Sequence, residues 1–184
     1  MRLYLVRHPQ PLVAADTCYG YTDLAVSAEE HARVLSSLRA TLPGREPVFC
    51  SPLQRCAALA DSLAGALHSE PAIHDARLAE MNFGSWEMRV WNDIPRAEID
   101  AWSDDLVHYR PGGGENVLQA AQRVRAFHDD LTYSRRECAI VICHAGTIRL
   151  LLACQRGLPP AEMALHAARL PHTIGYGEWI VLDC

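Results

Sequence analysis

The sequence predicts an α/β fold in three layers, with a mostly parallel central sheet flanked by helices, in a single domain over residues 1–184. Strand-like and helix-like patterns alternate along the chain without repeats or linkers. Two strand-like runs, residues 3–8 and 140–144, are apolar, and each ends on a histidine. A chain of 184 residues with a hydrophobic fraction of 49% can bury a sizeable core.

The first elements are a strand, a loop and a helix. Residues 3–7 predict a buried strand, followed by a loop to about Asp23. Ser27, with Glu30 three residues later, predicts a capping box at the start of a helix that ends near Leu42.

The middle of the chain is less regular. Residues 47–51 predict a short strand, and Pro52 is expected at the first position of a helix over residues 52–68. Residues 71–92 predict a short strand and an irregular stretch, and residues 93–106 an acidic helix. We expect this middle segment to cover one end of the sheet.

The last third returns to regular alternation. Residues 111–114 predict a glycine-rich loop, and residues 115–133 a long helix. A strand over residues 138–143 leads into a helix over residues 147–156, and residues 173–182 predict one or two strands.

Composition restricts the class and location of the protein. The seven cysteines are an odd number and form no CxxC pair, so we expect reduced thiols in a cytoplasmic protein, without a disulfide framework or a metal site. No apolar run approaches the roughly 20 residues that span a bilayer, and Met1-Arg2 leads directly into a strand, so no membrane span or signal peptide is expected. The oligomeric state stays open, with a dimer as one option.

Charge restricts the chemistry further. The formal net charge of −5 argues against general affinity for nucleic acid. All seventeen basic residues are arginine, which excludes a P-loop lysine, a Schiff-base lysine and a lysine general base. Arginine, histidine and backbone N–H groups must therefore hold any phosphate, and arginine can donate two parallel hydrogen bonds to phosphate oxygens.

Two histidines follow predicted strands, His8 after Arg7 and His144 before Ala145-Gly146. Open α/β sheets bind ligands at this edge. A neutral imidazole whose other ring nitrogen is fixed as a donor can attack phosphorus, and neighbouring arginines favour that neutral form by lowering the pKa. Alone, either histidine could merely end a strand or lie in the core. Together they predict a pocket for a small phosphate ester.

An arginine and a carboxyl group complete the candidate constellation. Arg55 lies in the first turn of a predicted helix, where an arginine and the helix N-terminus form an anion site. Glu80 has apolar neighbours, which we expect to raise its pKa so that it acts as the general acid for a departing alkoxide. Glu87 is the rival acid, with packing or capping as its other interpretation.

Five segments in this order carry a family resemblance: Leu5-Val6-Arg7-His8, Ser51-Pro52-Leu53-x-Arg55, Leu78-x-Glu80-x-x-Phe83-Gly84-x-Trp86-Glu87, Pro111-Gly112-Gly113-Gly114-Glu115 and His144-Ala145-Gly146. They resemble the histidine phosphatase superfamily, the phosphoglycerate-mutase-like enzymes. The resemblance implies that His8 becomes phosphorylated, that Glu80 donates the proton, and that Arg7, Arg55 and His144 hold the phosphate. Pro9 replaces the family's usual glycine; it keeps the carbonyl that would orient His8 but fixes φ, so the loop is expected to differ.

The length and one loop point to a branch of that family. The longer cofactor-dependent mutases are less similar than the short phosphatases, and residues 18–23 are similar to the CYGxTD stretch of α-ribazole phosphatases. That similarity implies hydrolysis of the 5′-phosphate of α-ribazole 5′-phosphate, or of the cobamide 5′-phosphate, without a cofactor. It also implies substrate contacts from Gln10, Tyr19, Tyr21 and Thr22. The two tyrosines either stack on the benzimidazole ring or pack within the loop.

Three other functions stay open. One is a broad or sugar-phosphate phosphatase of the same fold. Another is a phosphatase of protein phosphohistidine, for which Glu80 would matter less because phosphohistidine is a good leaving group. The third is a catalytically silent binding domain, and Pro9 is the feature that favours it.

Overall fold

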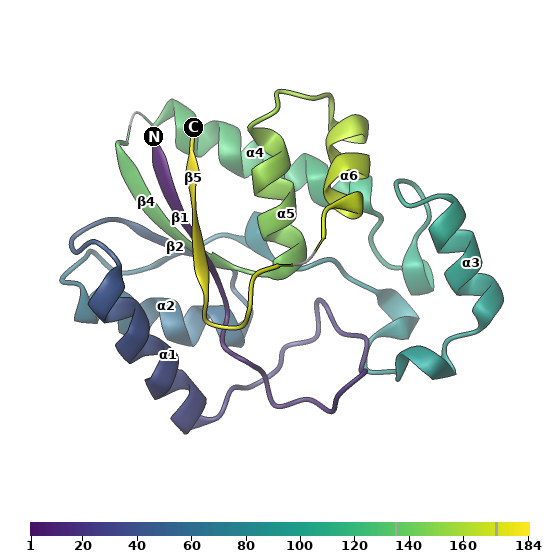
Figure 1. The fold of residues 1–184 in the computed structure, drawn as a ribbon, viewed down its shortest axis with the longest axis horizontal. Helices are drawn as coiled ribbons and strands as arrows, with labels where there is room; N and C mark the ends of the chain where they lie inside the picture. The colour runs from purple at the N-terminus through teal and green to yellow at the C-terminus, as the bar shows by residue number, and fades with distance from the viewer. Residues whose placement is uncertain (135, 172) are drawn as a thin grey trace.

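A five-stranded, mostly parallel sheet forms the centre of the molecule (Figure 1). The computed structural model describes residues 1–134, 136–171 and 173–184. The sheet order is β3-β2-β4-β1-β5. The strands are β1 (Arg2–Arg7), β2 (Val48–Cys50), β3 (Ile73–His74), β4 (Cys138–Cys143) and β5 (Trp179–Asp183). The first four run parallel, and β5 runs antiparallel to β1, so the C-terminal region forms one strand.

Helices cover both faces of this sheet, which confirms the predicted three layers. They are α1 (Ala28–Thr41), α2 (Gln54–Ala66), α3 (Arg96–Asp104), α4 (Val117–Tyr133), α5 (Ala145–Cys154) and α6 (Pro160–Arg169). Helices α1 and α2 lie on one face, α4 and α5 lie on the other, and α6 packs against both α4 and α5 (Figure 1).

The central strands alternate between two apolar cores. Leu3, Leu5 and Val141 pack with α4, α5 and α6, whereas Val6 and Ile142 pack with α1 and α2. A parallel sheet covered on both faces needs apolar side chains on both, which explains the continuous apolar runs in the sequence.

The start of α1 forms half of the predicted capping box. The Ser27 hydroxyl accepts the N–H of Glu30, but the carboxylate of Glu30 binds Arg33 instead of returning the bond. A complete capping box occurs at α4, where Asn116 and Gln119 exchange both hydrogen bonds.

Two other helices differ from the prediction. Pro52 is not the first residue of α2, because the Ser51 hydroxyl accepts the N–H of Leu53 and the helix begins only at Gln54. Helix α6 was not predicted. Its buried residues, Met163, Ala164 and Ala167, do follow a helical spacing, so the sequence carried a signal that our prediction did not use.

The middle segment covers the carboxyl end of the sheet, as expected. Phe83-Gly84 packs against the turn at residues 111–114. Gly84 and Gly112 have φ of 55° and 57°. A Cβ on Gly84 would overlap the backbone of Gly112, and a Cβ on Gly112 would overlap the backbone of Phe83. Glycine is therefore required at both positions. Within the residues described, no helix is long and apolar enough to cross a membrane.

Candidate active site

His8 follows β1 directly and is almost fully buried. Its Nδ1 lies 2.7 Å from the carbonyl oxygen of Pro9, and because a carbonyl only accepts, Nδ1 carries the ring hydrogen. Burial and the charges of Arg55 and Arg7 lower the pKa of His8 well below its usual value, against the opposing effect of the Pro9 bond. Nε2 therefore keeps its lone pair at neutral pH. The Pro9 carbonyl orients the ring as the sequence predicted.

His144 stands beside His8 because β4 and β1 are neighbours. Arg7 pairs with Cys143 in the sheet, and the two imidazole centroids are 5.1 Å apart. His144 Nε2 lies 2.8 Å from the hydroxyl oxygen of Ser51, which follows β2. Burial, together with His8 and the nearby arginines, holds the pKa of His144 well below its usual value. Three parallel strands thus end at one pair of neutral imidazoles.

Arg7 and Arg55 flank the histidines, and each keeps a donor unused. Arg7 Nη1 donates to the carbonyl of Ile174 at 2.8 Å. Arg55 donates from Nη1 to the carbonyl of Thr22 at 2.7 Å and from Nη2 to that of Gly20 at 2.5 Å. The Nε of both arginines is buried without a hydrogen-bond partner among the described residues. Two cations with unused donors make a site for an anion.

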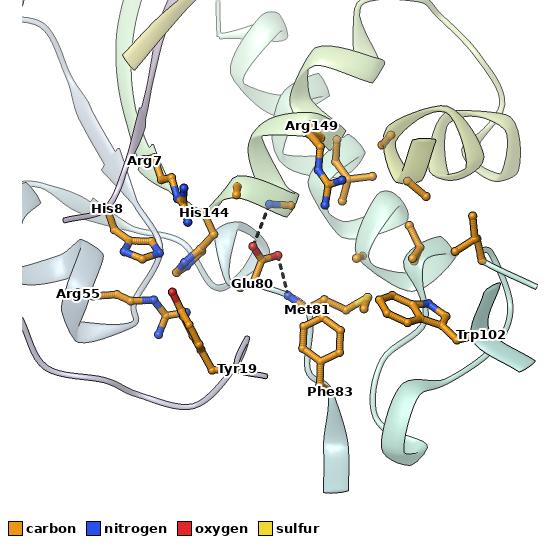
Figure 2. Close-up of a pocket in the computed structure, with 18 of the residues that line it drawn as sticks. Arg7, His8, Tyr19, Arg55, Glu80, Met81, Phe83, Trp102, His144 and Arg149 are labelled. Atoms are coloured by element: carbon orange, nitrogen blue, oxygen red, sulfur yellow. Dashed lines mark hydrogen bonds between the residues drawn. The ribbon is translucent and has the colours of Figure 1, made fainter. Parts of the chain in front are cut away.

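Glu80 is held by the N-terminus of α5. Its Oε2 accepts the N–H of Gly146 at 2.9 Å, and its Oε1 accepts the N–H of Met81 at 3.0 Å (Figure 2). A Cβ on Gly146 would lie 2.5 Å from Oε1, so glycine is what lets the carboxylate approach the helix. The surroundings of Glu80 are therefore more polar than the sequence suggested.

Glu87 has a different environment, outside the residues that line the cavity described below. Its carboxylate accepts the N–H groups of Gly20, Tyr21, Thr22 and Phe83 and the hydroxyl of Thr22. Burial favours the protonated form, but these hydrogen bonds outweigh it and lower the pKa of Glu87. Glu87 thus fixes the loop over residues 20–22, whose carbonyls hold Arg55.

One cavity of about 430 Å³ joins these groups to an apolar region. The cationic half contains Arg7, His8, Arg55 and His144, and Glu80 lies between it and the apolar half (Figure 2). The apolar half is built from the middle segment, α4 and α6, and contains Met81, Phe83, Trp91, Trp102, Leu106, Val117, Ala120, Ala167 and Ala168.

The four other candidate residues differ in whether they line this cavity. Tyr19 lines the cavity, whereas Gln10, Tyr21 and Thr22 are not among its lining residues. Tyr21 is 51% exposed and borders a neighbouring hollow, and Gln10 is exposed, with its backbone N–H bonded to Glu30. Thr22 contributes indirectly: its carbonyl accepts a hydrogen bond from Arg55, and its N–H and hydroxyl donate to Glu87.

Two cavity residues, Tyr176 and Arg149, were missed by sequence reasoning. Arg149 lies on α5 three residues after Gly146, a spacing that places both on one helix face and could have revealed it. Tyr176 stacks its ring 3.7 Å from the guanidinium carbon of Arg7. Tyr176 lies within residues 173–182, which the sequence predicted as one or two strands, but β5 begins only at Trp179. No local signal indicated that its ring would contact Arg7.

Comparisons with known proteins show the family and the fold. The model of the histidine phosphatase superfamily (branch 1) matches residues 3–174. The chain is 31% identical to the adenosylcobalamin/alpha-ribazole phosphatase of Escherichia coli (strain K12), over 100% of this chain and 90% of that protein. The alpha-ribazole phosphatase from Shigella flexneri superposes with a TM-score of 0.80 at 30% identity, covering 100% of this chain and 90% of that one.

A mycobacterial glucosyl-3-phosphoglycerate phosphatase shares the fold, with a TM-score of 0.77 at 24% identity over 99% of this chain and 89% of that one. The fold, the paired histidines and the family match lead to one conclusion: this chain belongs to the histidine phosphatase superfamily, branch 1.

Proposed function

We propose that this phosphatase removes the 5′-phosphate of α-ribazole 5′-phosphate or of the corresponding cobamide 5′-phosphate. The observation that carries the proposal is the cavity that joins a cationic half to an aromatic half. The cationic half suits a phosphate dianion, and the aromatic half suits a flat apolar leaving group such as a benzimidazole nucleoside. Two similar proteins named as alpha-ribazole phosphatases support this choice of leaving group.

In the first step, Nε2 of His8 attacks phosphorus. A nitrogen–phosphorus bond forms while the bond from phosphorus to the ribose oxygen breaks. Glu80, as the general acid, gives a proton to that oxygen. Arg7 and Arg55 stabilise the negative charge on the transferring group, and the loss of one such donor typically costs about 10²–10³ in rate.

In the second step, water attacks phosphorus of the phosphohistidine. The carboxylate of Glu80 accepts a proton from this water, and the nitrogen–phosphorus bond breaks. Inorganic phosphate leaves, His8 returns to its neutral form, and Glu80 is again protonated. Each group thus ends the cycle as it began.

We place the leaving group in the aromatic half of the cavity. The rings of Trp91 and Trp102 are parallel within 5°, and Phe83 meets both edge-on. We propose that the base lies against Phe83 and Trp102, and that Arg149, at the boundary between the halves (Figure 2), donates to oxygens of the ribose. Tyr21 has no role in base binding under this proposal.

We also place the reaction in the cytoplasm. All seven cysteines are free thiols, the usual state in a reducing compartment. The partner is a small phosphate ester.

The test is phosphate release from α-ribazole 5′-phosphate in EDTA, compared with p-nitrophenyl phosphate and 3-phosphoglycerate. We expect kcat/KM to be highest for the ribazole substrate and all turnover to be lost in His8→Ala. Trp102→Leu should lower kcat/KM for the ribazole substrate alone, and Tyr21→Leu, which removes a ring outside the cavity, is the matched control. Equal turnover of all three substrates would refute the ribazole assignment but leave the phosphohistidine mechanism intact.

A further inference from the structure

Two tyrosines from distant segments meet above the phosphate-binding arginines. The hydroxyl oxygens of Tyr19 and Tyr176 are 2.7 Å apart, although the residues are 157 positions apart in the chain. The ring of Tyr176 stacks on Arg7 and lies 5.5 Å from the ring of His8, centroid to centroid. The ring of Tyr19 lies 5.5 Å from the guanidinium carbon of Arg55. The pair therefore spans both cations and borders His8.

This pair of hydroxyl groups has one more O–H donor than it has acceptors in the protein. Two hydroxyl groups supply two O–H donors, and the bond between them uses one. Among the described residues, neither hydroxyl oxygen makes another hydrogen bond. One O–H therefore remains without an acceptor in the protein, in a cavity that Arg7 and Arg55 also line. Burial and the neighbouring phenol raise the pKa of Tyr19, so it stays a donor at neutral pH.

We propose that the Tyr19–Tyr176 hydroxyl pair is a phosphoryl-binding element, in which the free O–H donates to an oxygen of the phosphoryl group on its way to and from His8. The acceptor oxygen carries negative charge in the substrate, in the phosphohistidine and in the released phosphate. The two rings also hold the guanidinium groups in place by cation–π contact. The inference rests on His8 as the phosphate acceptor and is independent of the leaving group.

The test measures the affinity of the full-length protein for orthovanadate, by inhibition of p-nitrophenyl phosphate hydrolysis, in Tyr19→Phe, Tyr176→Phe and the double variant. Phenylalanine keeps each ring, and hence the arginine contacts, and removes only the hydroxyl. We expect at least one single variant to bind vanadate about tenfold or more weakly, the size of a hydrogen bond to a charged acceptor. Tyr21→Phe, outside the cavity on the same loop, should bind vanadate like the wild type.

The double variant distinguishes a shared donor from general disturbance. Each single variant keeps one hydroxyl, which has lost its orienting partner, and the double variant keeps none. The double variant should therefore bind vanadate at least as weakly as the weaker single variant, but two single losses should not multiply, since one O–H makes the contact. Losses that multiply in the double variant would overturn the shared donor, and wild-type affinity in all three would overturn the proposal. If the double variant does not fold, the single variants still decide, since each retains one hydroxyl. A failed ribazole assay with these vanadate losses intact would refute only the proposed substrate.

Discussion

Replacing Gly146 with alanine tests whether the position of Glu80 matters for catalysis. The added Cβ would lie 2.5 Å from Oε1, whereas ordinary contacts begin near 3.4 Å, so the carboxylate must move by about 1 Å. A displacement of about 1 Å in a catalytic group costs on the order of 10²-fold in rate. We therefore expect kcat for α-ribazole 5′-phosphate to fall about 100-fold, because an alkoxide needs a proton to leave.

The assay compares this substrate with p-nitrophenyl phosphate, whose nitrophenolate leaves without a proton. Its first step should change little in Gly146→Ala, and Glu80→Gln should show the same contrast between the two substrates. Gly65→Ala in α2 is the matched control, since its Cβ would meet nothing within 4 Å. Unchanged turnover of the ribazole substrate in Gly146→Ala would refute Glu80 as the acid. Equal losses in the first step of both substrates, measured as single-turnover release of the leaving group, would place the damage in the phosphate pocket.

Three further outcomes are expected. The free energy of unfolding should fall as pH drops from about 6.5 to 5, by up to about 1.4 kcal/mol per pH unit for each of His8 and His144. The reason is that burial keeps both histidines neutral in the folded protein, while the unfolded chain binds protons. Denaturant titrations at several pH values should show a smaller dependence of this free energy on pH in His8→Gln, and an equal dependence would contradict the prediction. Glu87→Gln should lower stability by about 2 kcal/mol through lost bonds to the loop that holds Arg55, and kcat of the ribazole substrate should fall much less than in Glu80→Gln, whereas a 100-fold loss of kcat at unchanged stability would make Glu87 the acid. Pro9→Gly should keep kcat within a few-fold, because the backbone carbonyl that binds His8 remains. Thermal unfolding should show a loss of about 0.5–1 kcal/mol in the free energy of unfolding. A 100-fold gain in kcat would mean that Pro9 impairs the enzyme.

The sequence predicted the strand ends of the site because their signal is local. His8 and His144 each follow an apolar run, and parallel strands must bring such ends to one edge of a sheet. The Pro9 carbonyl was also predictable, since it depends on one neighbouring residue. The roles of these side chains stay predictions until activity is measured.

The sequence could not show which loop residues enter the cavity. Tyr19 and Tyr21 are two positions apart in one motif, yet only Tyr19 lines it, because Glu87 holds the intervening backbone from a distant segment. Tyr176 depends on the same kind of long-range contact. Side-chain direction in irregular segments is set by such tertiary contacts and not by local pattern.

The two halves of the cavity belong to parts of the chain that can vary separately. In the cationic half, Arg7, His8 and His144 sit at the ends of buried strands, where a change of register would disturb the whole core, and Arg55 lies in the first turn of α2. The aromatic half sits on the middle segment, α4 and α6, outside the sheet. A library randomised at Phe83, Trp91, Trp102 and Ala168 should therefore yield enzymes with new leaving-group preferences and an unaltered phosphoryl-transfer step. Such a division makes this scaffold a favourable starting point for directed evolution of phosphatases.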